Sequence, residues 1–294
     1  MSDPVDQGRH LVETPSDIII QVRSRGEENG GPVALLLHGL GVGSGYWDLP
    51  VPGYNTMDYL AEQGVTAYAM DHRGYGGSGS APGDTVIGIR ALEDVLAVLD
   101  FVRTRSPGRP LSLVGHSWGG MVAVMAAAAR PQNVASLVCI GTPFRRVHPA
   151  FEERLPLIGA SSAPVDGWIA NQTHVGLDQL LYAYDEIVLR AYQHLIETEY
   201  PRIPLGIIGD CGTLPHVAAV EQLRLPTLLI HGTLELVVDR GDCLDFLDAL
   251  PAAEKDLLMV GNSGHLMGLE KLSHTHVDRA IAGWLLDHAV SRGR

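Results

Sequence analysis

Short runs of apolar residues recur along the chain, and most are bounded by glycine, proline or charged residues. The run Val33 to Leu37 contains no polar position, which is typical of a strand buried on both faces of a parallel sheet. The pattern predicts strands over residues 17–22, 33–37, 65–70, 111–114, 134–140, 226–232 and 256–260.

Between these runs, apolar residues return every three or four positions, which is the spacing of a helix with one buried face. The clearest example spans residues 85–103, with Leu92, Val95, Leu96, Leu99 and Val102 on one face. Similar reasoning predicts helices at 57–63, 121–129, 241–250 and 273–288. Strands that alternate with helices indicate the α/β class, in which right-handed crossovers join parallel strands.

The alternation stops over residues 144–225, where scattered prolines and aromatic residues accompany helical segments without a convincing strand. We expect residues 1–143 and 223–294 to form the core domain and residues 144–222 to form a helical lid, with its clearest helix at 177–199. The lid contains aromatic side chains that either line a substrate pocket or pack the lid on the core. They are Trp168, Tyr182, Tyr184 and Tyr192.

The predicted strand that starts at Leu111 ends in Gly115-His116-Ser117-Trp118-Gly119, and good helix formers follow from Met121 to Ala129. A serine at such a strand-to-helix turn has strained backbone and a hydroxyl that points away from the sheet. The N-terminus of the following helix favours negative charge beside that hydroxyl. Ser117 is therefore a candidate nucleophile.

Two glycine-rich loops follow predicted strands. The loop 38–41 carries backbone N–H groups that can donate to an anion. The loop 71–79 contains Gly74 and Gly76 at the spacing of a dinucleotide-binding turn, but no helix begins after it, so we expect no nucleotide there. Instead, Asp71 and Arg73 are expected to hold that loop with hydrogen bonds.

Composition narrows the classes of partner. The 294 residues carry a formal net charge of -13, which argues against nucleic acid and anionic membrane surfaces as partners. Three widely spaced cysteines suggest neither a disulfide framework nor a zinc site. No apolar run approaches the roughly 20 residues that span a bilayer. We therefore expect a cytoplasmic protein that acts on a small molecule without a metal or cofactor. The composition is compatible with either a monomer or a homodimer.

A serine hydroxyl needs a base, and the base needs an acceptor that fixes its tautomer. Among the thirteen histidines, His265 lies in a glycine-flanked loop just after the last predicted strand, at the same sheet edge as Ser117. Glu235 follows the strand 226–232 at that edge among apolar neighbours, which favours it as the acceptor over Asp239. Asp239 and Asp242 are expected to start the next helix.

These motifs, taken in chain order, resemble the α/β-hydrolase superfamily over nearly the whole chain from about Asp17. The resemblance rests on the segments 38–41, 71–78, 115–119, 232–235 and 264–265. It implies a mostly parallel eight-stranded sheet flanked by helices, with Ser117 as nucleophile and His265 as base. It also implies an oxyanion hole from the N–H groups of Leu40 and Trp118. Glu235 departs from the family pattern, since relatives usually carry aspartate in its slot.

The resemblance implies acyl transfer to water, with an ester, thioester or lactone of a small to medium, largely apolar molecule as substrate. Serine in place of aspartate at the nucleophile position disfavours epoxide hydrolase and dehalogenase chemistry. Two alternatives stay open. The same residues could carry out non-hydrolytic or C–C bond chemistry with His265 as base, or the fold could serve as a ligand receptor.

Overall fold

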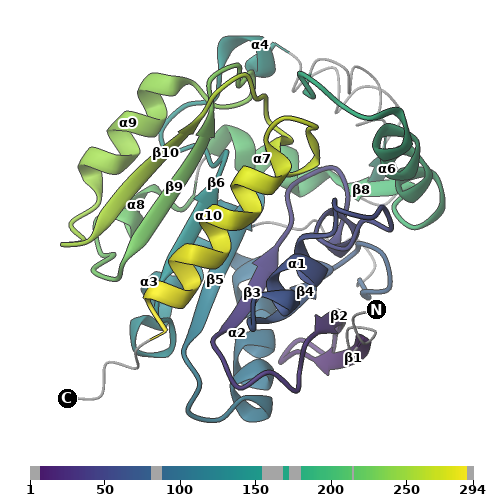
Figure 1. Ribbon diagram of the computed structural model, residues 1–294, viewed down its shortest axis with the longest axis vertical. Coiled ribbons are helices and arrows are strands. Elements are labelled where there is room, and N and C mark those ends of the chain that lie inside the picture. Colours follow the sequence, from purple (N-terminus) through teal and green to yellow (C-terminus); the bar gives the residue numbers. More distant parts are fainter. Residues whose placement is uncertain (1–6, 81–87, 154–167, 172–179, 214, 290–294) are drawn as a thin grey trace.

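The computed structural model describes residues 7–80, 88–153, 168–171, 180–213 and 215–289. An eight-stranded sheet forms its centre, with the strand order β1-β2-β4-β3-β5-β6-β9-β10 (Figure 1). From β4 to β10 neighbouring strands are parallel, whereas β1 and β2 are antiparallel to their neighbours. The strands are β1 (Gln7–Glu13), β2 (Ile19–Arg25), β3 (Val33–Leu37), β4 (Thr66–Met70), β5 (Leu111–His116), β6 (Leu137–Ile140), β9 (Thr227–Gly232) and β10 (Lys255–Val260). The mostly parallel eight-stranded sheet is therefore confirmed.

Helices cover both faces of this sheet, so the central strands consist almost entirely of buried positions. Helix α1 packs beside α10 in front of the sheet, and α2 packs beside α3 behind it (Figure 1). The core helices are α1 (Thr56–Glu62), α2 (Gly88–Arg105), α3 (Trp118–Ala129), α9 (Arg240–Ala249) and α10 (His274–Asp287). Short 3-10 helices occupy Ser44–Tyr46, Pro131–Asn133 and Met267–Leu269.

A long segment separates β6 from β9, where the sequence predicted an insertion. Its described elements are α4 (Pro149–Glu152), β7 (Trp168–Ala170), α6 (Glu186–Thr198), β8 (Arg202–Pro204), α7 (Leu205–Thr213) and α8 (Val217–Val220). Strands β7 and β8 pair antiparallel in a small sheet of their own, although the sequence predicted no strand here. Three-residue strands are too short to leave a periodic signal, and only their pairing defines them.

The helix predicted at 177–199 begins later, at Glu186, and residues 177–179 lie outside the described part of the chain. The prediction was wrong for residues 180–185, because their backbone pairs with the loop after β10. The carbonyl of Leu180 accepts from the N–H of His265 at 3.1 Å, and the carbonyl of Ala183 accepts from the N–H of Lys271 at 2.8 Å. Tertiary hydrogen bonds thus replace the helical ones that the local apolar pattern favoured.

The N-terminal end also differs from expectation. The strand predicted at 17–22 runs from Ile19 to Arg25, since Asp17 adopts a left-handed φ of 59° in the turn before it. Strand β1 was not predicted, because it is an edge strand whose sequence is largely polar. The remaining predicted elements are present, with ends displaced by at most three positions, except that residues 85–87 of the helix predicted at 85–103 lie outside the described part of the chain.

The loop after β4 has the structural role that the sequence predicted for Asp71 and Arg73. The Asp71 carboxylate accepts from the backbone N–H of Ser44 at 2.6 Å and from the amide of Gln21 at 3.0 Å. Arg73 forms a buried ion pair with Asp94, with its Nη2 2.6 Å from Oδ1. Both residues therefore tie this glycine-rich loop to neighbouring elements.

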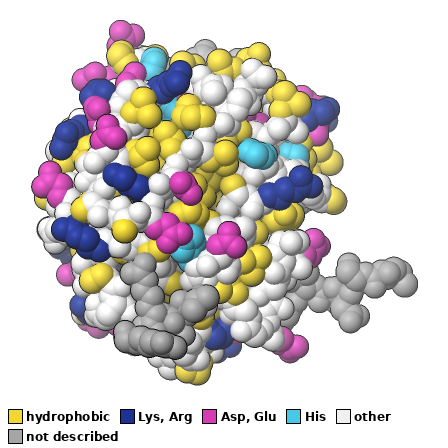
Figure 2. Space-filling model, turned by 60° about the vertical axis from the view of Figure 1, so that its left-hand side comes forward, with side chains coloured by type: hydrophobic (Ala, Val, Ile, Leu, Met, Phe, Trp, Pro, Cys, Tyr) yellow, Lys and Arg dark blue, Asp and Glu magenta, His cyan; other side chains and the backbone are white. Residues whose placement is uncertain are grey.

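On the side of the molecule that carries α9 and β10, Figure 2 shows apolar side chains interspersed with acidic and basic ones. Lysines and arginines occur singly or in small groups among the acidic residues, so this face has no continuous basic stripe. Among the described residues, none of the helices has the length and apolar character that a membrane-spanning helix requires.

Stability is expected to depend on Asp278, a carboxyl in α10 that is 2% exposed and accepts from the Thr56 hydroxyl at 2.8 Å. Burial raises the pKa of this carboxyl to about 7. The folded state therefore holds the proton where the unfolded chain has lost it, and stability declines as the pH rises from about 4 to 7. Asp278→Asn removes this decline while keeping an acceptor for Thr56.

Urea unfolding at pH 5, 6, 7 and 8 measures the effect. The free energy of unfolding of the variant relative to the native protein is expected to rise with pH, by on the order of 2 kcal/mol in total. A difference between the two proteins that is the same at every pH would contradict the prediction.

Candidate active site

Ser117 occupies the turn between β5, which ends at His116, and α3, which begins at Trp118. Its backbone has φ 54° and ψ -123°, a strained conformation for a residue other than glycine. The N–H of Ser117 donates to the carbonyl of Ile140 in the neighbouring strand at 2.8 Å, which fixes the turn to the sheet. Ser117 is 8% exposed, so the turn holds its hydroxyl in a largely enclosed place.

The glycines around Ser117 allow this turn to form. A Cβ added at Gly115 would lie 2.5 Å from Cα of Gly120, and one at Gly119 would clash with the carbonyl of His38. Gly120 in turn faces the side chain of Thr142 too closely for a Cβ. These close approaches explain the small residues at the start of α3 and let the loop after β3 pass directly beside Ser117.

The loop after β3 also has a fixed orientation next to Ser117. A Cβ at Gly39 would lie 3.0 Å from Cβ of Ser117. His38 Nδ1 donates to the carbonyl of Gly39 at 2.7 Å, while its Nε2 accepts from the N–H of His72 at 3.0 Å. Burial lowers the pKa of His38 to about 4, so its ring is neutral in this arrangement. Because C=O and N–H point in opposite directions across a trans peptide, holding the Gly39 carbonyl also sets the direction of the Leu40 N–H.

A histidine and a glutamate meet at the ends of two other strands. His265 Nδ1 donates to Oε2 of Glu235 at 2.8 Å, and both side chains are almost fully buried. The second oxygen, Oε1, accepts from the N–H of Val237 at 2.7 Å. Desolvation alone raises the pKa of the Glu235 carboxyl, but the charge of His265 and these hydrogen bonds outweigh it, so the pKa lies below its ordinary value. Glu235 is thus ionised at neutral pH and orients the imidazole.

The histidine lies next to the serine turn. The ring of His265 packs on that of His116, the residue before Ser117, with centroids 4.7 Å apart. Among the described residues, no hydrogen bond joins Ser117 Oγ to His265 Nε2. Such contacts are often long without substrate and tighten when it binds. The structure therefore brings the three predicted residues to one edge, with the histidine–glutamate contact formed.

The other candidate residues have different surroundings. Asp239 caps α9, because its Oδ1 accepts from the N–H of Gly241 at 2.8 Å and of Asp242 at 3.2 Å. His231 lies buried within β9, and His274 begins α10. The cap role expected for Asp239 is confirmed, and this carboxylate is turned to the helix.

The predicted aromatic residues of the inserted segment divide into packed and exposed ones. Trp168 covers Gly74 so closely that a Cβ there would overlap the indole ring. Tyr192 is 3% exposed and belongs to the core, and Tyr184 packs partly buried against it. Tyr182 is 59% exposed. Trp168, Tyr184 and Tyr192 therefore attach this segment to the core.

Sequence reasoning missed two carboxylates that join the inserted segment to the core, one of them through Trp118 beside Ser117. Asp242, expected only at a helix start, also accepts from the N–H groups of Phe144 at 2.6 Å and Arg145 at 2.9 Å. Asp210 in α7 accepts from the indole N–H of Trp118 at 3.1 Å. No spacing in the sequence relates these partners, because they are far apart along the chain.

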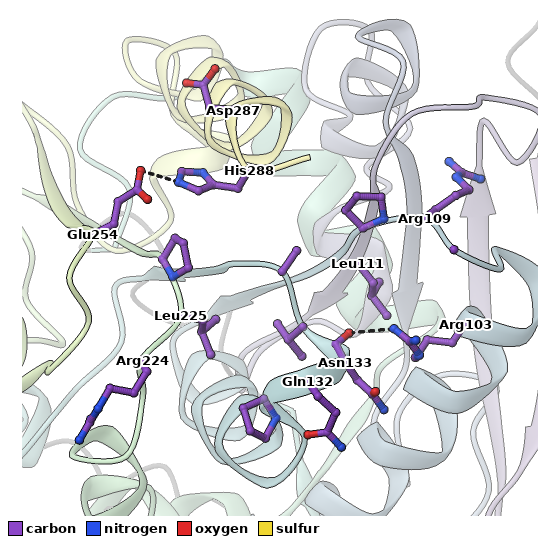
Figure 3. Close-up of a pocket in the computed structure, with 16 residues that line it drawn as sticks. Arg103, Arg109, Leu111, Gln132, Asn133, Arg224, Leu225, Glu254, Asp287 and His288 are labelled. Atoms are coloured by element: carbon purple, nitrogen blue, oxygen red, sulfur yellow. Dashed lines mark hydrogen bonds and ion pairs between the residues drawn. The ribbon is translucent and has the colours of Figure 1, made fainter. Parts of the chain in front are cut away.

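A pocket of about 630 Å³ lies at the opposite edge of the sheet, where β5, β6 and β9 begin (Figure 3). Ser117, Glu235 and His265 are not among its lining residues. The guanidinium of Arg103 donates a hydrogen bond to the carbonyl of Asn133 (Figure 3). The guanidinium of Arg109 donates to the carbonyl of Gly31 at 2.7 Å. Because these two arginines bind backbone oxygens, their charges are not directed into the pocket. The proposed reaction is therefore placed at Ser117 and not in this pocket.

The sheet order, the strained serine after β5 and the histidine–glutamate contact beyond β9 and β10 define a serine hydrolase of the α/β-hydrolase class. Residues 33–271 match the family model described as serine aminopeptidase, S33. The chain belongs to this family.

Its relatives include lipases of comparable length. Human monoglyceride lipase is 25% identical over 284 residues, which cover 90% of this chain and 86% of the relative. The monoacylglycerol lipase of Mycolicibacterium smegmatis is 24% identical over 261 residues, covering 87% of this chain and 88% of the relative. The fold also superposes on a soluble variant of Saccharomyces cerevisiae monoglyceride lipase with a TM-score of 0.76. That match has 18% identity and covers 99% of this chain and 97% of the other.

Proposed function

We propose that this chain hydrolyses a carboxylic ester through an acyl-enzyme on Ser117. The observation that carries the proposal is the buried His265–Glu235 hydrogen bond of 2.8 Å, formed beside the strained turn that presents Ser117. A neutral imidazole with its Nδ1 proton held by a carboxylate has a free Nε2, which is the arrangement a general base requires.

The reaction then proceeds in two halves. His265 Nε2 accepts the Ser117 proton as Oγ attacks the ester carbonyl, and the oxyanion is bound by the N–H groups of Leu40 and Trp118. His265 returns the proton to the departing alkoxide, which leaves as an alcohol. A water molecule next gives a proton to His265 and attacks the acyl carbonyl. The bond between the acyl carbon and Oγ then breaks, His265 returns the proton to Oγ, and the acid is released. Glu235 stays ionised and stabilises the imidazolium in both halves.

The substrate that we propose is an ester of a small to medium, largely apolar molecule, and a monoacylglycerol is the first to test. The names of the curated relatives support this choice, since several are monoglyceride or monoacylglycerol lipases. Thioesters and lactones remain within the proposed range, because the same steps apply to their carbonyl groups. Residues 144–222 would act as the lid over residues 1–143 and 223–294, and the hydrogen bond from Trp118, the residue after Ser117, to Asp210 of this segment supports that role.

The proposed setting is a reducing compartment such as the cytoplasm. The three cysteines, Cys139, Cys211 and Cys243, are free and buried, which suits such a compartment. The proposal includes neither a nucleic acid nor a membrane partner.

A fluorophosphonate probe and intact-mass spectrometry test the covalent step. The probe is expected to add one phosphonyl group per chain with loss of fluoride, and the protein is expected to hydrolyse a medium-chain monoacylglycerol. A panel of short and long acyl esters, thioesters and lactones then ranks the substrates. A protein that neither takes up the probe nor turns over any member of the panel would refute the proposal. Hydrolysis of the panel without the adduct would refute the acyl-enzyme on Ser117 and favour direct activation of water by His265.

A further inference from the structure

His116 lies between the nucleophile turn and the loop that carries His265. Its ring stacks on that of Tyr46, with centroids 4.5 Å apart and planes inclined by 16°. A second ring, the imidazole of His265, also packs on His116, with centroids 4.7 Å apart and an angle of 47°. His116 is 3% exposed, so packing against the two rings and the surrounding core fixes the position of its side chain.

The polar contact of His116 is with the main chain of His265. Its Nε2 lies 3.0 Å from the carbonyl oxygen of His265, and because a carbonyl only accepts, Nε2 must carry the proton. Burial is the main cause that lowers the pKa of His116, to about 3, and the charges of His265 and His38 act in the same direction. The carboxylate of Glu235 opposes them without cancelling them. The ring therefore stays neutral and donates from Nε2 at neutral pH.

The backbone of His265 is held from a second direction. Its N–H donates to the carbonyl of Leu180 in the inserted segment at 3.1 Å. The preceding N–H, of Gly264, donates to the buried carboxylate of Glu270 at 2.9 Å. His116 supplies the contact to the C=O side of His265. Of the groups named here, it is the one that directly adjoins Ser117 in the chain.

We propose that His116 is a positioning residue that sets the distance between Ser117 and the imidazole of His265 by holding the His265 carbonyl. The inference rests on the proposed function of Ser117 and His265. A displacement of a catalytic group by about 1 Å can lower the rate about 100-fold. Loss of one buried hydrogen bond that positions His265 is therefore expected to lower kcat. The polar contact of His116 is with the main chain of His265, so His116 acts through the position of that residue.

A matched set of substitutions separates the hydrogen bond from packing. His116→Gln keeps an N–H donor at the end of a flexible side chain, whereas His116→Met has nearly the same shape without a donor, and His116→Phe keeps a ring without a donor. We expect kcat for a monoacylglycerol or an activated ester to fall about 10- to 100-fold in the Met and Phe variants. KM should stay within about 3-fold, and the Gln variant should recover most of the loss.

Thermal unfolding controls for packing, since Gln and Met lose the same ring contacts. Equal kcat values for the Gln and Met variants, or a Met variant as active as the native protein, would overturn the proposal. If the Met variant does not fold, the comparison of Phe with Gln decides in the same way.

Hydrogen exchange of the peptide around residues 263–266 tests the contact without any substrate. Exchange is expected to be faster in the Met variant than in the Gln variant, and equal rates would count against the proposal. Failure of the proposed function is recognised separately, because it would remove ester turnover from the native protein itself.

Discussion

Replacing Ser117 with alanine is expected to lower kcat/KM for ester hydrolysis by at least about 10⁴-fold, the largest effect that we predict for a single side chain. The substitution removes the atom that forms the proposed covalent bond, while the proposed oxyanion donors, the N–H groups of Leu40 and Trp118, remain. Residual turnover should therefore still exceed that of water alone. The measurement is steady-state hydrolysis of a monoacylglycerol, combined with the loss of the fluorophosphonate adduct.

Ser112→Ala provides the matched control for this variant. Ser112 lies in the same strand β5, is buried, and shares a hydrogen bond of 2.8 Å with Ser136. Its loss is expected to affect thermal unfolding but to leave the rate within about 3-fold of the native value. Near-native turnover by Ser117→Ala, with the fold intact by circular dichroism, would exclude covalent catalysis at this serine.

Substitution of Glu235 by glutamine is expected to lower kcat by up to about 10⁴-fold, with a smaller change in KM. The amide is neutral and can present its NH₂ group to His265 Nδ1. The imidazole would then carry its proton on Nε2, and a protonated Nε2 cannot accept the proton of Ser117. The variant also lacks the negative charge that stabilises the imidazolium formed during the reaction.

Asp239→Asn makes the same chemical change four positions along the chain and serves as the control. Asp239 caps α9 through the N–H groups of Gly241 and Asp242, and the amide oxygen of asparagine can accept from the same groups. The variant should therefore keep its stability to within about 1 kcal/mol and leave kcat nearly unchanged. The reverse result, with a large loss of kcat in Asp239→Asn and little in Glu235→Gln, would assign the acid to Asp239.

The lowered pKa of Glu235 also sets the direction of a pH effect. Because the folded-state pKa lies below that of the unfolded chain, the His265–Glu235 contact stabilises the fold above the unfolded value. That contribution is lost as the pH falls through the folded-state value. Acid should thus weaken the orientation of His265 only well below neutral pH.

Local pattern was enough for most of the fold. Five central strands are apolar enough to be recognised one by one, and the glycines around Ser117 mark the turn from β5 to α3. The predicted position of Glu235 after β9 and of His265 after β10 follows from the rule that parallel strands end at one edge. These signals are short in range, so they can be read without knowing the tertiary structure.

Elements whose stability comes from distant partners escaped prediction. Strand β1 is defined by its pairing with β2, and β7 by its pairing with β8. The apolar residues 180–182 favoured a helix locally, but the carbonyl of Leu180 is occupied by His265 and Leu266. A long-range hydrogen bond of this kind leaves no periodicity in the sequence.

The amino-acid sequence by itself thus determined the class of fold, the strained serine turn and the sheet edge at which a base and an acid would meet. Only the tertiary structure decided that Glu235 contacts His265 while Asp239 caps a helix, and that His116 holds the main chain of His265. The physical reason is that backbone conformation and burial periodicity arise between near neighbours. A contact between residues far apart in the chain depends on where the whole core places them.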